Sequence, residues 1–260
     1  MTQILALAGT KQSGKTSGAH FISAYVISQI ARLNLEAPLF KIFHQRDDGK
    51  IIIPIEEEGG IIDFSSKEDN YAEYASEMIW PYVKIYSFAD TLKEVAVNVF
   101  GIPYEQIYGS NAQKALPTHL LWENLPSSIS RGNTGYMAGR DFMQYFGSDI
   151  CRTLYPDIWA DSCIAKIIAD ESDIAIIDDC RFINEINKVK EVGGKVIKLQ
   201  REIDNDEHVS EKEIREAPLE LFDYVIDNKN TPIQTKNQEI LDYLYKIGWF
   251  TSHIDYNGGE

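Results

Sequence analysis

One short stretch near the start of the chain constrains the fold more than any other. Residues 9 to 16 read Gly-Thr-Lys-Gln-Ser-Gly-Lys-Thr and fill every fixed position of the pattern G-x-x-x-x-G-K-[ST]. That pattern describes a glycine-rich loop whose backbone N–H groups surround a phosphate. It requires a buried strand before it and a helix after it, because the helix N-terminus adds partial positive charge beside the phosphate.

The residues on both sides of the loop have the patterns that this motif requires. Residues 4 to 8 read Ile-Leu-Ala-Leu-Ala, an uninterrupted apolar run that is typical of a buried strand. After the loop, apolar residues recur at the spacing of one helix face: Ile22, Tyr25, Val26, Ile30 and Leu33. Strand, glycine-rich loop and helix together predict a site for the phosphates of a nucleotide.

The loop residues differ in what they can do for a bound nucleotide. Glycines at positions 9 and 14 let the backbone turn its N–H groups toward phosphate oxygens. Lys15 can reach the β- and γ-phosphates, and the hydroxyl of Thr16 can ligate magnesium. We expect the phosphates to be surrounded by the following residues: Gly9, Lys11, Ser13, Gly14, Lys15, Thr16 and Ser17.

Further apolar segments alternate with helical patterns along the rest of the chain. Besides the first strand, four more are expected, at residues 83–88, 174–177, 195–199 and 224–227. Such alternation predicts an α/β fold, a three-layer sandwich with a mostly parallel five-stranded sheet, whose ligands bind at the carboxyl ends of the strands. We expect one domain over residues 1–250 and a loose tail over residues 251–260.

Two segments depart from this alternation. Residues 39 to 64 hold three β-like pieces separated by the turn signals Asp48-Gly49 and Gly59-Gly60, and they predict a small antiparallel meander inserted into the domain. Residues 101 to 137 are rich in Gly, Pro, Asn and Ser and have weak periodicity, so we expect a long loop there.

The negative charge of the chain is concentrated around the insertion. Residues 47 to 77 hold ten acidic residues and two lysines, a net charge of −8 out of −15 for all 260 residues. This segment is either a solvated face or a docking surface for a basic partner. A basic face of the kind that binds duplex DNA is not visible in the sequence, so a nucleic-acid partner is not expected.

The remaining composition indicates a soluble, cytoplasmic protein. No apolar run approaches the roughly 20 residues of a membrane span, and the first residues have no basic region typical of a signal peptide. The three cysteines lack the spacing of metal ligands, and we expect reduced thiols. The oligomeric state, a homodimer included, is left open.

A phosphate loop alone does not distinguish motors, GTPases and kinases. The guanine-reading pattern Asn-Lys-x-Asp is absent, since residues 228–231 read Asn-Lys-Asn-Thr. Motor ATPases usually place a Glu beside the acid that ends a core strand, whereas this chain has the pair Asp178-Asp179. Both observations disfavour a GTPase or a motor.

Three other segments narrow the class further. Residues 87–94 read Ser-Phe-Ala-Asp-Thr-Leu-Lys-Glu, and residues 139–149 read Gly-Arg-Asp-Phe-Met-Gln-Tyr-Phe-Gly-Ser-Asp, with Trp159 following. Residues 177–185 contain the pattern D-x-R-x-x-x-E. With the phosphate loop, and in this order and spacing, these segments resemble the bacteriophage deoxynucleoside monophosphate kinases over about two thirds of the chain.

The chain departs from that family in two respects. Several relatives have Asp directly after the loop lysine, where this chain has Thr16. The meander at residues 39–64 has no clear counterpart. The resemblance implies transfer of the γ-phosphoryl group of ATP, with magnesium, to a deoxynucleoside monophosphate. Such an enzyme would supply DNA precursors during phage replication, in the cytoplasm of the infected cell.

The resemblance also implies roles for individual residues. Lys15, Arg140, Asp179 and Arg181 would be catalytic, with the two arginines on the acceptor phosphate or the transferred group. Thr16 and Asp179 would hold the metal. The acceptor would be bound by Asp90, Lys93, Arg140, Gln144, Gly147, Ser148, Trp159, Asp179, Arg181 and Glu185.

Alternative interpretations of these residues stay open. Trp159 is equally consistent with a buried core position, and Glu185 with a residue that orients Arg181. Residues 208–211 resemble a family H-x-S/T-E piece, which a helix cap at Ser210 also explains. Two other functions compete with the first: a kinase acting on hydroxymethylated bases within DNA, and a non-catalytic nucleotide-binding regulator.

Overall fold

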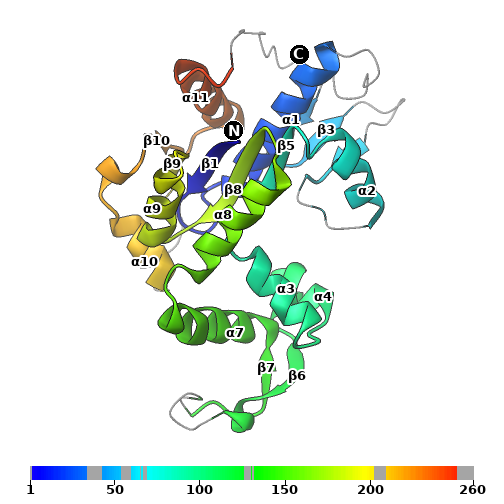
Figure 1. Cartoon of the computed structure of the whole chain (residues 1–260), viewed down its shortest axis with the longest axis vertical. Coiled ribbons are helices and arrows are strands. Elements are labelled where there is room, and N and C mark those ends of the chain that lie inside the picture. Colours follow the sequence, from blue (N-terminus) through cyan, green and yellow to red (C-terminus); the bar gives the residue numbers. More distant parts are fainter. Residues whose placement is uncertain are drawn as a thin grey trace. The chain divides into compact units, whose positions relative to one another are not determined.

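The computed structural model describes residues 2–33, 43–53, 60–64, 66, 69–125, 130, 132–201 and 209–250. The chain forms two compact units (Figure 1). The first combines Met1–Ser87 with Ile164–Glu260, and the second is the continuous segment Phe88–Cys163. The expected tail at residues 251–260 lies outside the described residues, and a single domain over residues 1–250 stays a prediction.

The first unit is built on the predicted five-stranded sheet, and every neighbouring pair of strands is parallel. The strand order is β10-β9-β1-β8-β5. The strands are β1 (Gln3–Ala8), β5 (Val83–Tyr86), β8 (Ile174–Cys180), β9 (Lys195–Gln200) and β10 (Tyr224–Asp227). The expected α/β architecture with a parallel core sheet is therefore confirmed.

Helices cover both faces of this sheet, as the apolar character of the strands requires. They are α1 (Lys15–Leu33), α2 (Asp69–Met78), α8 (Ile158–Asp170), α9 (Ile183–Glu191), α10 (Val209–Glu216) and α11 (Ile233–Lys246), with a 3-10 turn η4 (Leu219–Leu221). Leu5 and Leu7 of β1 belong to one core cluster with residues of α1 and α11. Alternation along the strand turns Ala6 and Ala8 to the other face, and α9 contacts β1 and β9 there.

The predicted meander forms a three-stranded antiparallel sheet in the order β2-β3-β4. Its strands are β2 (His44–Gln45), β3 (Ile51–Ile53) and β4 (Gly60–Ile62). The first described strand lies at residues 44–45, and residues 39–42 and 54–55 lie outside the described residues. The expectation of a small inserted antiparallel element is confirmed.

The meander is fixed to α1 and α11 by one buried side chain. Gln45 Nε2 donates to the carbonyl of Ser17 at 2.8 Å, and Gln45 Oε1 accepts from Asn237 Nδ2 at 2.6 Å. Gly49, in the β2–β3 turn, has φ +85°, and a Cβ there would lie 2.7 Å from the Cβ of Ser17. Only glycine fits this close approach to the first turn of α1.

The second unit contains regular structure where a long loop was expected, so that expectation was wrong. Between residues 101 and 137 lie the short helices α4 (Tyr104–Tyr108) and α5 (Asn111–Lys114), the 3-10 turn η2 (Trp122–Asn124), and the antiparallel strands β6 (Pro117–Leu121) and β7 (Tyr136–Ala138). Each element is too short for a periodic pattern. α5, for example, is held by a capping box between Ser110 and Gln113.

The remaining helices of the second unit agree more closely with the sequence. α3 (Asp90–Asn98) begins within the segment Ser87–Glu94, and the predicted helix over residues 139–154 is α7 (Gly139–Gln144) continued by a π-helical segment, η3 (Tyr145–Arg152). A shared apolar cluster joins α3, α4, β7 and α7 through Ala96, Ile102, Ile107, Met137 and Phe142. In neither unit does a described helix have the length and apolar character needed to cross a membrane.

Candidate functional site

A polar or charged group of the first unit follows the carboxyl end of each of its five parallel strands. The phosphate loop follows β1, Ser87 follows β5, and Arg181 follows β8. Arg201 comes after β9, and Asn228 after β10. Because parallel strands end at one edge of the sheet, the fold gathers these residues on one side; of them, the sequence placed only the phosphate loop at this edge.

The phosphate loop has the backbone conformation that its glycines permit. Gly9 has φ +149° and Gly14 has φ +90°, which side chains with a Cβ rarely adopt. A Cβ on Gly9 would lie 2.5 Å from the carbonyl oxygen of Leu199 and 2.6 Å from Ser13 Oγ. Gln12, between the glycines, also has a positive φ of +60°. The loop is therefore a tightly packed turn that leads into the N-terminus of α1.

Lys15 is buried inside this turn, with 6% of its surface exposed. Its Nζ donates to the carbonyl oxygens of Gly9 and Thr10, each at 2.7 Å. Burial and, secondarily, the nearby Arg181 cation lower the pKa of Lys15 to about 8, against the opposing effect of neighbouring carboxylates. Loop carbonyls thus solvate a cation that phosphate oxygens would hold more strongly.

The two acids at the end of β8 have different partners. Asp178 Oδ2 accepts a hydrogen bond from Thr16 Oγ1 at 2.8 Å, whereas Asp179 accepts from the hydroxyl of Ser87. Successive residues of a strand point to opposite faces, which separates the two carboxylates. The structure therefore places Asp178 beside the expected metal ligand Thr16, and Asp179 beside the end of β5.

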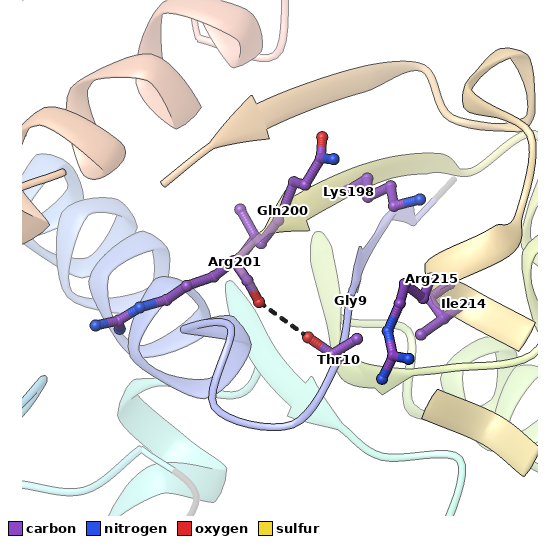
Figure 2. Close-up of a pocket in the computed structure, with 8 residues that line it drawn as sticks. Gly9, Thr10, Lys198, Gln200, Arg201, Ile214 and Arg215 are labelled. Atoms are coloured by element: carbon purple, nitrogen blue, oxygen red, sulfur yellow. Dashed lines mark hydrogen bonds between the residues drawn. The ribbon is translucent and has the colours of Figure 1, made fainter. Parts of the chain in front are cut away.

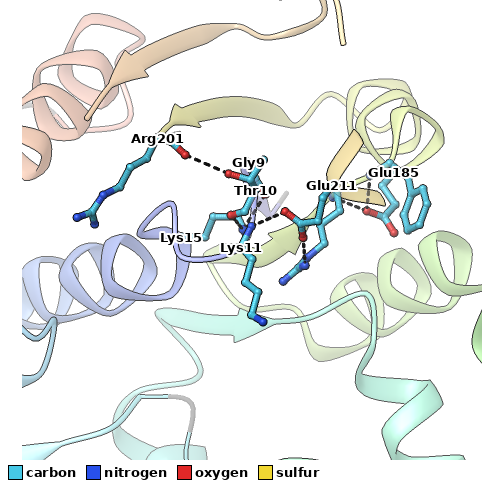
Figure 3. A network of polar contacts seen from close by, with 9 residues as sticks. Gly9, Thr10, Lys11, Lys15, Glu185, Arg201 and Glu211 are labelled. Carbon is cyan, nitrogen blue, oxygen red and sulfur yellow. Dashed lines mark hydrogen bonds and ion pairs between the residues drawn. The ribbon is translucent and has the colours of Figure 1, made fainter. Parts of the chain in front are cut away.

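Two carboxylates contact Arg181, those of Glu211 and Glu185, and both are labelled in Figure 3. Its guanidinium forms an ion pair with Glu211 of α10, a side chain that is only 2% exposed. The other Glu211 oxygen accepts from the backbone N–H of Lys11 at 2.6 Å. Glu185 Oε2 accepts from the backbone N–H groups of Arg181 and Phe182, at 2.8 and 3.1 Å. Glu185 thus fixes the backbone that carries Arg181, in agreement with the orienting role that the sequence allowed.

A second buried lysine, Lys236 of α11, contacts the other side of the loop. Its Nζ lies 3.0 Å from Ser17 Oγ and 3.4 Å from the carbonyl of Gly14, and burial lowers its pKa to about 8. Asn228 Nδ2 donates to the carbonyl of Ser13 at 2.7 Å. Sequence reasoning missed Lys236, and it noted Glu211 only as the last residue of the H-x-S/T-E piece and Asn228 only as part of an incomplete guanine signature.

Two cavities lie against the phosphate loop. The larger has a volume of about 360 Å³ and is lined by Gly14, Ser17, Asp47, Asp48, Gly49, Arg201, Asn228, Thr231, Pro232, Ile233 and Lys236. The smaller, of about 70 Å³, lies between the start of the loop, the end of β9 and α10 (Figure 2). There Thr10 Oγ1 donates to the carbonyl of Arg201 at 3.2 Å. The larger cavity is bordered in part by the inserted meander.

In the second unit, the structure brings several of the predicted residues together. Arg140 is exposed and donates to the carbonyl of Asn111 at 2.7 Å. The pKa of Lys114 is lowered by burial and by the cations of Lys93 and Arg140. Lys93 also forms an ion pair with Asp90 at 3.4 Å. The second unit therefore carries a cluster of three cations, of which the sequence identified Lys93 and Arg140 but not Lys114.

The other predicted residues of this unit have individual surroundings. Gln144 is exposed at the end of α7, and Ser148 is partly buried in the π-helical segment. The indole N–H of Trp159 donates to the carbonyl of Gly147 at 3.0 Å, and its ring packs in a cluster with Leu92. With 5% of its surface exposed, Trp159 has the geometry of the core position that the sequence allowed.

Comparisons with known proteins identify the family of the chain. The family model "Deoxynucleotide monophosphate kinase" matches residues 3–238. A protein of Acanthamoeba polyphaga mimivirus, named "Putative deoxynucleotide monophosphate kinase", is 30% identical over 162 residues, which cover 56% of this chain and 75% of the viral protein. The chain belongs to the deoxynucleotide monophosphate kinase family.

Proposed function

We propose that this protein transfers the γ-phosphoryl group of ATP to a deoxynucleoside monophosphate. The observation that carries the proposal is the convergence of the phosphate loop, the Thr16–Asp178 pair and the Arg181–Glu211 pair at one edge of the sheet. A phosphate acceptor is already anionic near neutral pH and needs little help from a general base. Catalysis then consists mainly of alignment and of neutralising charge on the transferred group.

The first unit supplies the groups that such a transfer requires. The loop amides other than that of Lys11, which Glu211 holds, would bind the β- and γ-phosphates together with Lys15, and Lys15 would exchange its carbonyl partners for phosphate oxygens. Thr16 and Asp178 would hold Mg²⁺, with Asp179 on the adjacent strand position. The metal would neutralise charge on the β- and γ-oxygens. Arg181 offers two parallel N–H groups to the transferred phosphoryl.

The cavity of about 360 Å³ is the proposed site of the donor nucleoside. It begins at Gly14 and Ser17, where the phosphate loop becomes α1, so a nucleotide bound through its phosphates would extend into it. Its volume is within the range of ligand sites in proteins. Asn228 fits this role, because within the described residues its Oδ1 has no hydrogen-bond partner, although only 5% of the residue is exposed.

The cations of the second unit are the proposed acceptor-binding groups. Arg140 can form paired hydrogen bonds with the phosphate of a mononucleotide, and Lys93 and Lys114 add charge. Gln144 lies one helical turn after Arg140 and could contact the base. Asp90, Gly147, Ser148 and Trp159 complete the proposed acceptor residues, and Trp159 acts there by supporting Gly147. This role for the second unit follows from the resemblance and from its charge.

The test is a direct assay of acceptor choice. Purified protein, ATP and Mg²⁺ are incubated with dTMP, dGMP, dCMP or dAMP, or with an oligonucleotide that contains hydroxymethylated bases, and radiolabelled products are separated. We expect deoxynucleoside diphosphates from one or more of the mononucleotides. Transfer to the oligonucleotide alone, or no transfer at all, would contradict the proposal. The Lys15→Ala variant is the matched control and should be inactive while remaining folded.

A further inference from the structure

Glu211 is a buried carboxylate for which the chemistry of phosphoryl transfer has no obvious use. It lies in the first turn of α10, with 2% of its surface exposed. One oxygen pairs with the guanidinium of Arg181, and the other accepts from the N–H of Lys11 at 2.6 Å (Figure 3). Burying a carboxylate is unfavourable unless such partners compensate for the lost hydration. A buried charge at this point therefore needs an explanation.

Glu211 is not required merely to attach α10 to the sheet. Ile214 of the same helix is completely buried and supplies an apolar anchor. Glu213 Oε1 accepts from the backbone N–H of Ile183 at 2.7 Å, which ties α10 to the start of α9. Two contacts that do not involve Glu211 therefore attach α10 to the rest of the unit. An apolar side chain at position 211 could provide the same packing as Glu211.

The two partners of Glu211 are both parts of the proposed active site. The Lys11 amide belongs to the phosphate loop, 200 residues away in sequence, and Arg181 follows the strand that ends in the metal-binding acids. One carboxylate thus fixes the distance between the loop and the arginine. Without it, a long flexible side chain would sample many rotamers, and a misplacement of about 1 Å can reduce the rate of a reaction about a hundredfold.

We propose that Glu211 is a positioning residue for phosphoryl transfer, which holds the Arg181 guanidinium and the phosphate loop in one fixed arrangement. Glu211 does not itself touch the nucleotide in this role. It acts through Arg181, so its loss should reduce the stabilisation of the transition state more than the affinity for ATP. The inference rests on the proposed function, since it concerns the residues of that site.

A double-mutant cycle tests this coupling. The kcat and KM for ATP are measured for wild type, Glu211→Gln, Arg181→Ala and the double variant. The Gln side chain keeps the volume and an acceptor for the Lys11 amide but removes the charge. We expect Glu211→Gln to lower kcat at least about tenfold, or 1.4 kcal/mol, with KM for ATP changed less than about threefold. In the Arg181→Ala background the same substitution should change kcat less than about twofold.

Glu213→Gln is the matched control, because it removes a carboxylate from the same helix two residues away. It should leave kcat within about twofold of wild type in both backgrounds. A purely structural role for Glu211 would lower the folded fraction but would leave the kcat per folded molecule unchanged. Equal losses in the two backgrounds, or an unchanged kcat for Glu211→Gln, would therefore overturn the proposal.

A measurement on the wild-type protein covers the case in which Glu211→Gln does not fold. Lys11 is exposed, so its amide hydrogen should exchange rapidly unless Glu211 accepts its bond. We expect slow exchange of this amide by NMR, both without nucleotide and with a non-hydrolysable ATP analogue. Rapid exchange in the analogue complex would refute a fixed arrangement. If active wild type is never obtained, the proposed function fails, whereas this exchange measurement still decides whether Glu211 holds the loop.

Discussion

The lowered pKa of Lys15 predicts that nucleotide binding takes up a proton. Burial brings this pKa to about 8, from an ordinary value of 10.5. About half of the free protein therefore has a neutral Lys15 at pH 8, about a tenth at pH 7 and about nine tenths at pH 9. The difference of about 2.5 pH units corresponds to a net cost of roughly 3 kcal/mol for the charged form, which comes mainly from burial and also from Arg181. The negative oxygens of a bound triphosphate would stabilise the charged form of Lys15, so a neutral Lys15 would take up a proton on binding.

The direction of the effect follows from the lowered value. Binding requires the protonated lysine, so affinity for ATP should be fully present below about pH 8 and should fall tenfold per pH unit above it. Isothermal titration calorimetry at pH 8 in buffers of different ionisation enthalpy measures the proton uptake directly. ATP itself is fully ionised at this pH and contributes little to the signal.

A pair of variants isolates the contribution of Lys15. Lys236 also has a pKa of about 8 and lies against the loop, so its proton uptake would add to that of Lys15. The difference between wild type and Lys15→Met should be about half a proton at pH 8, and Lys236→Met should retain that half proton. Equal uptake by wild type and a Lys15→Met protein that still binds ATP would refute the reasoning.

Three further predictions concern the loop and the arginines. Gly9→Ala should lower the free energy of unfolding by about 1–3 kcal/mol in a urea titration, because its Cβ would collide with the Leu199 carbonyl. Gly101→Ala is the control: Gly101 also has a positive φ but has open space around it, so this variant measures the cost of the backbone conformation alone. Arg181→Lys should lower kcat/KM at least about tenfold, because an ammonium lacks two parallel donors; full activity at low substrate would show that Arg181 is structural. Arg140→Ala should raise KM for all monophosphates similarly. Gln144→Ala should instead change the discrimination between bases by about 1–3 kcal/mol and so alter the order in which the monophosphates are preferred. Unchanged KM values and an unchanged order of preference would contradict these roles.

The sheet and the loop were predictable because their signals are local. Five apolar segments of strand length and one complete motif determine the parallel core, and no distant contact is needed to recognise them. The short elements between residues 101 and 137 were missed for the corresponding reason, since helices of four or five residues have no measurable period. Their stability comes from a capping box and from a cluster around Ile107.

The site was predictable only where a residue lies within a motif. Lys236 resembles an ordinary polar residue of an amphipathic helix, and only the packing of α11 beside α1 buries it. Glu211 ends the H-x-S/T-E piece noted in the sequence, but its partners are 30 and 200 positions away, and no local pattern reveals them. The strand that carries Asp178 and Asp179 was clear from the sequence. Which of the two acids lies beside Thr16 depends on the register of this strand with β1, which the sequence does not show.

The position of β1 in the middle of the sheet has a consequence for synthesis of the chain. Its two neighbours are β8 and β9, so that Gln3 pairs with Ile174 and Leu5 pairs with Lys195, 190 residues later. At about 5–20 residues per second, a ribosome needs roughly 10–40 s to make that interval. Until β8 is made near the end of this interval, β1 and its apolar side chains have no neighbouring strand to pair with, and they depend on transient contacts or on chaperones. The phosphate loop is thus synthesised well before the strands that hold β1 in place, and it acquires its structure only after they have been made.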